Sequence, residues 1–472
     1  MSQDVNPYTE AQIRSIQSIR GIGLVCLIGI LPAFCFVAEL TGTEAYAGAA
    51  FLVAAMTSFW RSSKRRWAAL SLVGMFSVAA GVHALGGLVL AGPTTNAIWG
   101  GTRLVDFYPR AFMVISAGLL AAAAGFRLGV RLRVEWVARW CKSLTIDDAK
   151  LLRWTQLLTL AGALLIILVY YTVGYIPLLT PAPEQSRYLT DAVSANYQRD
   201  EWVVSRGMDL LTFALPLMIA WCLWKPGWRN ITIAAGGFLA LLLPLRRANF
   251  GSIVLTAVVI EVLRNGRLKK RYLGIIALVA LAYGVSQLMF FNLLDQESDY
   301  HEVLTAAGSA LPEVRDLGWM MSINDEKWYG MTFLQAVLPI PSFVSEFSHE
   351  HSLRQITTRA IGLDVEGQTG GLRLTLAGES YFNFGYFGVA VVGFLFGLAC
   401  AVLDAAVAQL KNTDGIAGIY LSALLFSWLC FWLYLAGTQA AATIKIGLIL
   451  MIFVLFFSRQ RSAPQRPTTR LA

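Results

Sequence analysis

The chain of 472 residues is strongly apolar, with 56% hydrophobic residues, 14% charged residues and a formal net charge of +9. A soluble globular protein carries about 25% charged residues, so this composition excludes a soluble fold and indicates a core that lies in lipid. The polar segment 1–20 lacks the pattern of a cleavable signal peptide, and we expect the first apolar run to direct its own insertion.

Apolar runs long enough to cross a bilayer core of about 30 Å recur along the chain. They predict an all-α, polytopic membrane protein with about twelve transmembrane helices. In chain order the predicted spans are 21–40, 45–60, 67–92, 111–129, 154–173, 208–224, 231–245, 248–263, 272–290, 384–403, 416–436 and 439–458. Residues 1–472 are thus predicted to form a single membrane domain, with two long polar segments at 174–207 and 291–383.

Lys and Arg residues are concentrated in connections that this arrangement places on one side of the membrane. These basic segments are 61–66, 127–153, 264–271 and the tail after 459. Because cytoplasmic connections carry the excess of positive charge, we expect both termini to be cytoplasmic and the two long polar segments to be external. The net charge then reflects topology and contact with anionic membrane lipids, and it gives no reason to expect a nucleic-acid partner.

The segment 231–263 is too long for one ordinary span and contains the pair Arg246 and Arg247. Pro244 offers a natural break, which predicts a tight hairpin with both arginines at its outer turn. Guanidinium groups below the membrane surface are costly unless they face water or an anion, and paired planar forks suit a phosphate or pyrophosphate group. The alternative is an ordinary pair that binds lipid phosphates or loop carboxylates.

A second group of polar residues lies where the large external segment returns to the membrane. Arg373 and Glu379 are predicted at the mouth of the apolar span that starts at 384, with Tyr381 and Asn383 close by. A carboxylate at such a cavity could act as general base for a sugar hydroxyl, while the arginine holds a diphosphate. An ion pair that merely closes the start of a helix explains the same residues equally well.

Weaker candidates lie within the external segments. Arg187 and Arg199 stand near aromatic residues in the first segment, a combination that suits phosphate contact and sugar stacking. In the second segment, His349 and His351 could serve as base or ligand, and the acidic stretch 295–302 could bind a hard cation. A solvated polar surface explains all of them as well, so we assign no metal site and no cofactor.

Taken together, these features resemble a known family. Many spans, an arginine turn after a short helix, a large late external loop and the stretch GESYFNFGYFG at 378–388 are similar to the Wzy-type O-antigen and exopolysaccharide polymerases. The resemblance implies a metal-independent glycosyltransferase of GT-C-like architecture in the bacterial inner membrane. It would polymerise polyprenyl-diphosphate-linked oligosaccharide repeat units at the periplasmic face, by passing the growing glycan onto a new unit. A chain-length regulator would be a partner protein.

The resemblance also implies roles for residues at matching positions. The arginines that would bind diphosphate are Arg246, Arg247 and Arg373. Glu379 would be the base or orienting group, and the acceptor pocket would be shaped by Tyr381 and Asn383.

Two other functions compete with this one. An O-antigen ligase would hand finished glycan to a different acceptor, and His349 or His351 would then matter more. A flippase or transporter of lipid-linked oligosaccharide would need charges along a path between both faces. The sequence instead concentrates the candidate residues on one face and shows no internal repeat, which favours surface chemistry.

Overall fold

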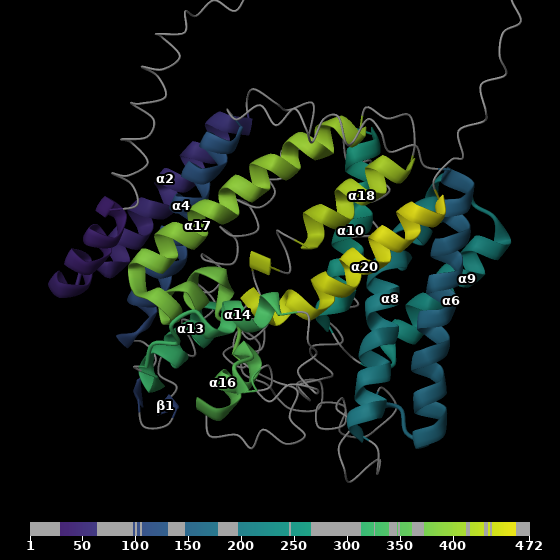
Figure 1. The fold of residues 1–472 in the computed structure, drawn as a ribbon, viewed down its shortest axis with the longest axis horizontal. Helices are drawn as coiled ribbons and strands as arrows, with labels where there is room; N and C mark the ends of the chain where they lie inside the picture. The colour runs from purple at the N-terminus through teal and green to yellow at the C-terminus, as the bar shows by residue number, and fades with distance from the viewer. Residues whose placement is uncertain are drawn as a thin grey trace, which may run out of the picture.

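The structure is a computed structural model and describes residues 29–63, 98–99, 102–103, 106–130, 147–177, 197–244, 247–265, 313–324, 326–338, 347, 350–360, 372–411, 416–428, 433–434 and 437–458. These residues are almost entirely helical (Figure 1), as the apolar pattern predicts. The strands found among them are one short antiparallel pair, β1 (Ile98–Trp99) and β2 (Thr102–Arg103). The all-α prediction is therefore confirmed for the described part of the chain.

Four helices in the described ranges are long and apolar enough to cross a membrane. They are α4 (Tyr108–Gly129), α6 (Asp148–Val173), residues Arg199–Cys222 of α8 (Tyr197–Trp224) and residues Thr375–Ala406 of α17 (Thr375–Lys411). Shorter apolar helices are Gly29–Thr41, Glu44–Phe59 of α2 (Glu44–Ser63), α9 (Trp228–Leu242), α18 (Ile416–Phe426) and Ile444–Phe457 of α20 (Ala441–Ser458). The length and the apolar composition of these helices identify the chain as a membrane protein. The predicted spans 67–92 and 272–290 lie outside the described residues.

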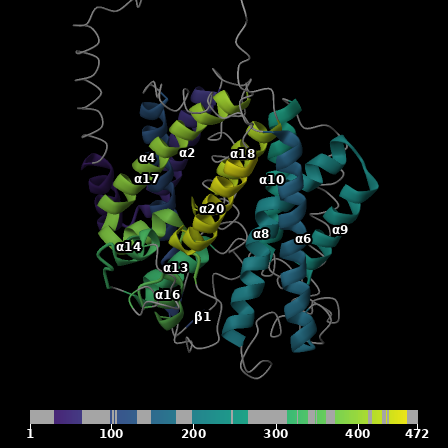
Figure 2. The ribbon, with the colours of Figure 1, turned by 45° about the vertical axis from the view of Figure 1, so that its right-hand side comes forward.

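The helices form two packed groups (Figures 1 and 2). In one group α4 lies between α2 and α17, and in the other α6, α8 and α9 pack against one another. Helix α18 contacts α17 in one group and α6 in the other, whereas α20 packs on α6 and α8. Helix α10 (Arg247–Asn265) packs on α8 and α18. The larger of two buried apolar cores joins α2, α4 and α17 to one face of α8, and the smaller core lies among α6, α8 and α9.

Glycines bring α4 and α17 into backbone contact. A side chain at Gly393 would lie 2.7 Å from the carbonyl oxygen of Gly118, and one at Gly397 would overlap the backbone of Ala122. One at Gly125 would overlap the carbonyl group of Phe394. Small residues spaced in this way allow membrane helices to approach closely, because dispersion contacts between backbones replace contacts with lipid.

The chain breaks between α9 and α10, where Pro244 predicts an interruption. Helix α9 ends at Leu242 and α10 begins at Arg247, so the long apolar segment is two short helices. Both helices pack on α8. Arg246 and the side chain of Arg247 lie outside the described residues, so their predicted contact with an anion stays a prediction.

Short elements of the predicted external segments gather at one end of the bundle. Figures 1 and 2 both show β1 there with α13 (Glu313–Ile323), α14 (Met331–Val337) and α16 (Leu353–Ala360). The start of α17 and the short 3₁₀ helix η4 (Gly437–Ala440) pack against this group. The candidate residues 373–383 therefore lie at the end of the bundle where these short helices are collected.

Two helix starts differ most from the prediction. Helix α17 begins at Thr375 and not near residue 384, so Glu379, Tyr381 and Asn383 are helical. The helix is kinked at Phe384 and at Gly385, whose φ is +65°. Helix α8 begins at Tyr197, inside the segment predicted as an external loop. In both places polar residues precede the apolar run, so the helix begins before that run does.

Candidate functional site

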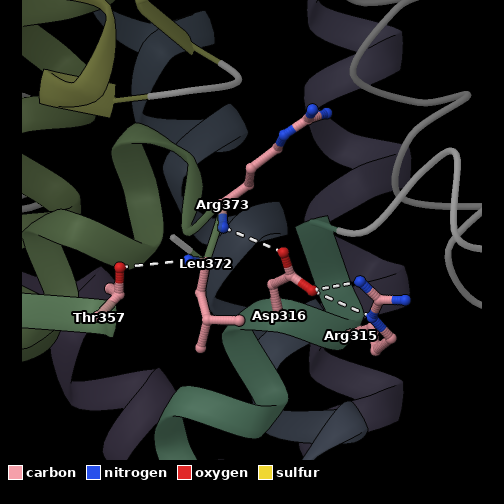
Figure 3. A network of polar contacts seen from close by, with 5 residues as sticks. All are labelled: Arg315, Asp316, Thr357, Leu372 and Arg373. Atoms are coloured by element: carbon pink, nitrogen blue, oxygen red, sulfur yellow. Dashed lines mark hydrogen bonds and ion pairs between the residues drawn. The ribbon is translucent and has the colours of Figure 1, made fainter. Parts of the chain in front are cut away.

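The start of α17 is held by side chains from α13 and α16. The Asp316 carboxylate accepts the Arg373 backbone N–H at 3.0 Å, and the Thr357 hydroxyl accepts that of Leu372 at 3.1 Å (Figure 3). Thr375 follows with a φ of +60°, and its hydroxyl accepts the Gly378 N–H at 3.2 Å, which caps the first turn. A β-branched residue at positive φ is strained, so tertiary contacts must fix the backbone here.

Asp316 is the central group of this network. It is buried, and its Oδ1 accepts hydrogen bonds from the Arg315 Nη2 at 2.7 Å and Nε at 3.0 Å. Burial raises the pKa of Asp316, and the charge of Arg315 and the Arg373 N–H oppose that shift. Asp316 is therefore a positioning residue, because it fixes the main chain from which the Arg373 side chain extends.

The Arg373 guanidinium points away from Asp316 and is exposed (Figure 3). Among the residues that the structure describes, this guanidinium has no hydrogen-bond or ion-pair partner. The alternative interpretation, an ion pair between Arg373 and Glu379, is not among the ion pairs of that part of the chain. An exposed cation with a fixed backbone and no partner in the described part of the chain suits an anionic ligand.

The sequence predicts Glu379 at a cavity at the mouth of a span, whereas the structure encloses its side chain. Its side chain is completely buried, and its two carboxylate oxygens accept hydrogen bonds from the Thr438 N–H at 2.7 Å and from the Thr438 hydroxyl. The Thr332 hydroxyl is a third partner. A side chain at Gly437 (φ +56°) would collide with this carboxylate, so the start of η4 fits closely over it. Glu379 thus joins α17 to α14 and to the segment that leads into α20.

Asn383 is also buried, and both of its polar atoms are bonded. Its Oδ1 accepts the Gly330 N–H at 2.8 Å, and its Nδ2 donates to the Thr332 hydroxyl at 2.9 Å and to the Glu379 carbonyl at 2.8 Å. These contacts tie the start of α14 to α17. In this structure the side chain supports the surroundings of Glu379 and does not line an open pocket.

Tyr381 packs against a polar cluster that the sequence does not predict. Its ring centroid lies 5.1 Å from that of Tyr386 and 4.4 Å from the Lys327 Nζ. The Tyr386 hydroxyl donates to Glu39 at 2.6 Å, and Arg110 forms an ion pair with the same carboxylate at 2.9 Å. Glu39 and Arg110 each stand at the edge of a predicted span. A charge in that position is a signal that could have identified them.

Two other predicted residues, Arg199 and His351, make their contacts elsewhere. The exposed Arg199 side chain pairs with its neighbour Asp200 at 3.2 Å, and the His351 ring stacks on Phe347 with centroids 4.4 Å apart. Arg187, His349 and the acidic stretch 295–302 lie outside the described residues. Within the described ranges no three His, Cys, Asp or Glu side chains are grouped as a metal site would need.

Asp316 gives a testable pH dependence. Its pKa in the folded protein is raised above the ordinary value of 3.8, so between these two values the folded state keeps a proton that the unfolded state has lost. Stability should therefore fall as pH rises through that window and level off above it. Asp316→Asn lacks this contribution, whereas the other titrating groups are common to both proteins. Thermal unfolding of both between pH 4 and 7 should give curves that diverge, and parallel curves would contradict the assignment.

The site thus offers, just before α17, a guanidinium without a partner among the described residues and, within that helix, a carboxylate enclosed by two threonines. These are the groups that bind a diphosphate and receive a proton in acyl or glycosyl transfer. Comparisons with protein-family models, with curated proteins and with solved structures found no match for this chain.

Proposed function

We propose that this protein is a glycosyltransferase that polymerises polyprenyl-diphosphate-linked oligosaccharide repeat units at the periplasmic face of the bacterial inner membrane. The observation that carries the proposal is the Arg373 guanidinium, which is exposed and unpaired among the described residues while Asp316 holds its backbone. The helix that starts there also carries Glu379. A diphosphate carrier requires such a cation at the membrane boundary.

In the proposed reaction an acceptor sugar hydroxyl attacks the anomeric carbon of the growing glycan. The bond from that carbon to the carrier diphosphate breaks, and its electron pair goes to the departing diphosphate oxygen, whose charge Arg373 stabilises. Glu379 takes the proton of the acceptor hydroxyl. Because Thr332 and Thr438 enclose the carboxylate, this role requires the start of η4 to move from α17 when the acceptor binds.

The finer architecture belongs to the same proposal. We infer about twelve spans in a GT-C-like arrangement with cytoplasmic termini, a chain-length regulator as partner, and diphosphate contacts from Arg246 and Arg247 as well. The grouping of α13, α14 and α16 at one end of the bundle supports chemistry on a single face.

Replacing Arg373 by alanine tests the proposal. The purified protein would be reconstituted in vesicles with its polyprenyl-diphosphate-linked repeat unit, and polymer would be measured as a ladder on a gel. We expect Arg373→Ala to lower the rate by about a hundredfold, the usual effect of removing one group that stabilises transition-state charge. The unfolding temperature should not change, because the guanidinium has no partner among the described residues. Arg373→Lys should recover part of the rate, since it restores charge without the planar fork.

Arg359→Ala is the matched control. Arg359 is an exposed arginine of α16 at the same end of the bundle, and it has no part in the proposed site. Equal rates for Arg373→Ala, Arg359→Ala and the parent protein would overturn the proposed role of Arg373. Movement of the lipid-linked sugar across the vesicle membrane without new glycosidic bonds would overturn the proposed polymerase activity and indicate a transporter.

A further inference from the structure

An apolar groove of about 390 Å³ lies between α14, α17 and α20. Its lining is almost entirely hydrocarbon, with Phe333 from α14, Leu395 and Phe396 from α17, and Ile444 from α20. Such a surface is suited to an apolar chain and offers almost no hydrogen bonds to a sugar or a peptide. The polar exceptions lie on η4 and on the first turns of α20, which follow each other in the chain.

Lys445 is one of those exceptions. Its Nζ donates to the Leu338 carbonyl at 2.6 Å, which uses one of the three donors of an ammonium group. No carboxylate of the described residues forms an ion pair with it. A cation in an apolar helix is costly unless an anion or water faces it. The groove therefore combines an apolar surface with a positive charge that lacks an acidic partner in the described part of the chain.

Thr438 is the other polar residue of the groove. Its N–H and hydroxyl both bond the Glu379 carboxylate, so the groove wall is in direct contact with the proposed proton acceptor. A lipid that lies along this wall would contact η4, whose Thr438 is bonded to that carboxylate. A lipid elsewhere on the bundle surface would not have this relation to Glu379.

We propose that the groove binds the isoprenoid chain of the carrier lipid and that the Lys445 ammonium contacts its phosphate. This inference rests on the proposed function and adds a subsite to it. Charge complementarity selects a phosphorylated lipid over a neutral one. The contact through Thr438 ties occupancy of the groove to the state of Glu379.

Binding of undecaprenyl phosphate and of uncharged undecaprenol to the full-length protein in phosphatidylcholine nanodiscs tests the subsite. Lys445→Gln should weaken undecaprenyl phosphate binding by about tenfold, the effect of one charge-assisted hydrogen bond, and leave undecaprenol unchanged. Ala399→Trp projects an indole from an exposed position of the groove wall and should weaken binding of both lipids. Native mass spectrometry of the nanodisc contents gives the bound fractions.

Two variants serve as controls. Lys225 lies over the Trp221 ring outside the groove, and Ala50 is an exposed position of α2, so Lys225→Gln and Ala50→Trp should bind both lipids as the parent does. Equal loss from Lys225→Gln and Lys445→Gln would overturn the inference. Displacement of undecaprenyl phosphate by an equal amount of phosphatidylglycerol would also overturn it, because the groove would then be a general lipid site.

The outcomes separate this inference from the proposed function. If Lys445 and Ala399 control lipid binding but no polymer forms, the subsite stands and the polymerase fails. If polymer forms while neither variant changes binding, the polymerase stands and the subsite fails.

Discussion

Replacing Gly397 by leucine should prevent the group formed by α2, α4 and α17 from packing normally. Gly397 faces the backbone of Ala122 in α4, and even a Cβ atom there would overlap it. Backbone cannot move aside as a flexible side chain can, so α4 and α17 would have to separate along a contact made by several glycines. We expect a loss of more than about 3 kcal/mol, at the upper end for overpacking. Size-exclusion profiles and thermal unfolding in detergent measure it.

The matched control is Gly236→Leu. Gly236 is an exposed helical residue of α9, and a Cβ atom there meets nothing within 4 Å. Leucine is also a better helix former than glycine by up to about 1 kcal/mol, so this variant should unfold at or slightly above the parent temperature. If both leucine variants unfold together at the parent temperature, the close approach of α4 and α17 is wrong.

The membrane helices could be predicted from the sequence because hydrophobicity in a bilayer is a local signal. The apolar runs locate α4, α6 and α20 to within a few residues, and the excessive length of 231–263 locates the break near Pro244. These predictions use chain length against membrane thickness, and they need no knowledge of which helices touch.

The start of α17 could not be predicted in the same way. Arg373, Glu379 and Asn383 interrupt the apolar run, so hydropathy alone places the helix start too late. The helix begins at Thr375 because Asp316 and Thr438, which lie far away in the sequence, satisfy its polar groups. Tertiary hydrogen bonds thus outweigh the local cost of burying these side chains.

The cluster of Glu39, Arg110 and Tyr386 shows the same limit. Glu39 and Arg110 stand near the ends of their helices and Tyr386 lies inside α17, so their contacts exist only once three helices are side by side. The sequence also identifies Glu379 as a candidate without revealing its burial. Its placement follows from the fit of Gly437 over the carboxylate, which no local pattern encodes.

Glu379→Gln should abolish polymer formation while leaving the fold in place. Glutamine has nearly the same shape as glutamate, and its carbonyl oxygen can accept the Thr438 N–H while its amide donates to the Thr438 hydroxyl. It cannot take up a proton from an acceptor hydroxyl. We expect the rate to fall by at least about a hundredfold, as for loss of a general base. The ladder assay and the unfolding temperature measure the two effects separately.

Glu261→Gln is the control for burial. Glu261 is also buried, but it lies on α10 and accepts the Nε1–H of Trp224 from α8. Because it is outside the proposed site, Glu261→Gln should polymerise normally. Glu379→Ala sharpens the test, because it leaves the buried Thr438 N–H unpaired and should cost about 1–3 kcal/mol of stability. Full activity in Glu379→Gln with a lower unfolding temperature in Glu379→Ala would show that the carboxylate only joins η4 to α17. Loss of activity in both variants, with normal stability in Glu379→Gln, would show that the reaction needs a carboxylate that can take up a proton.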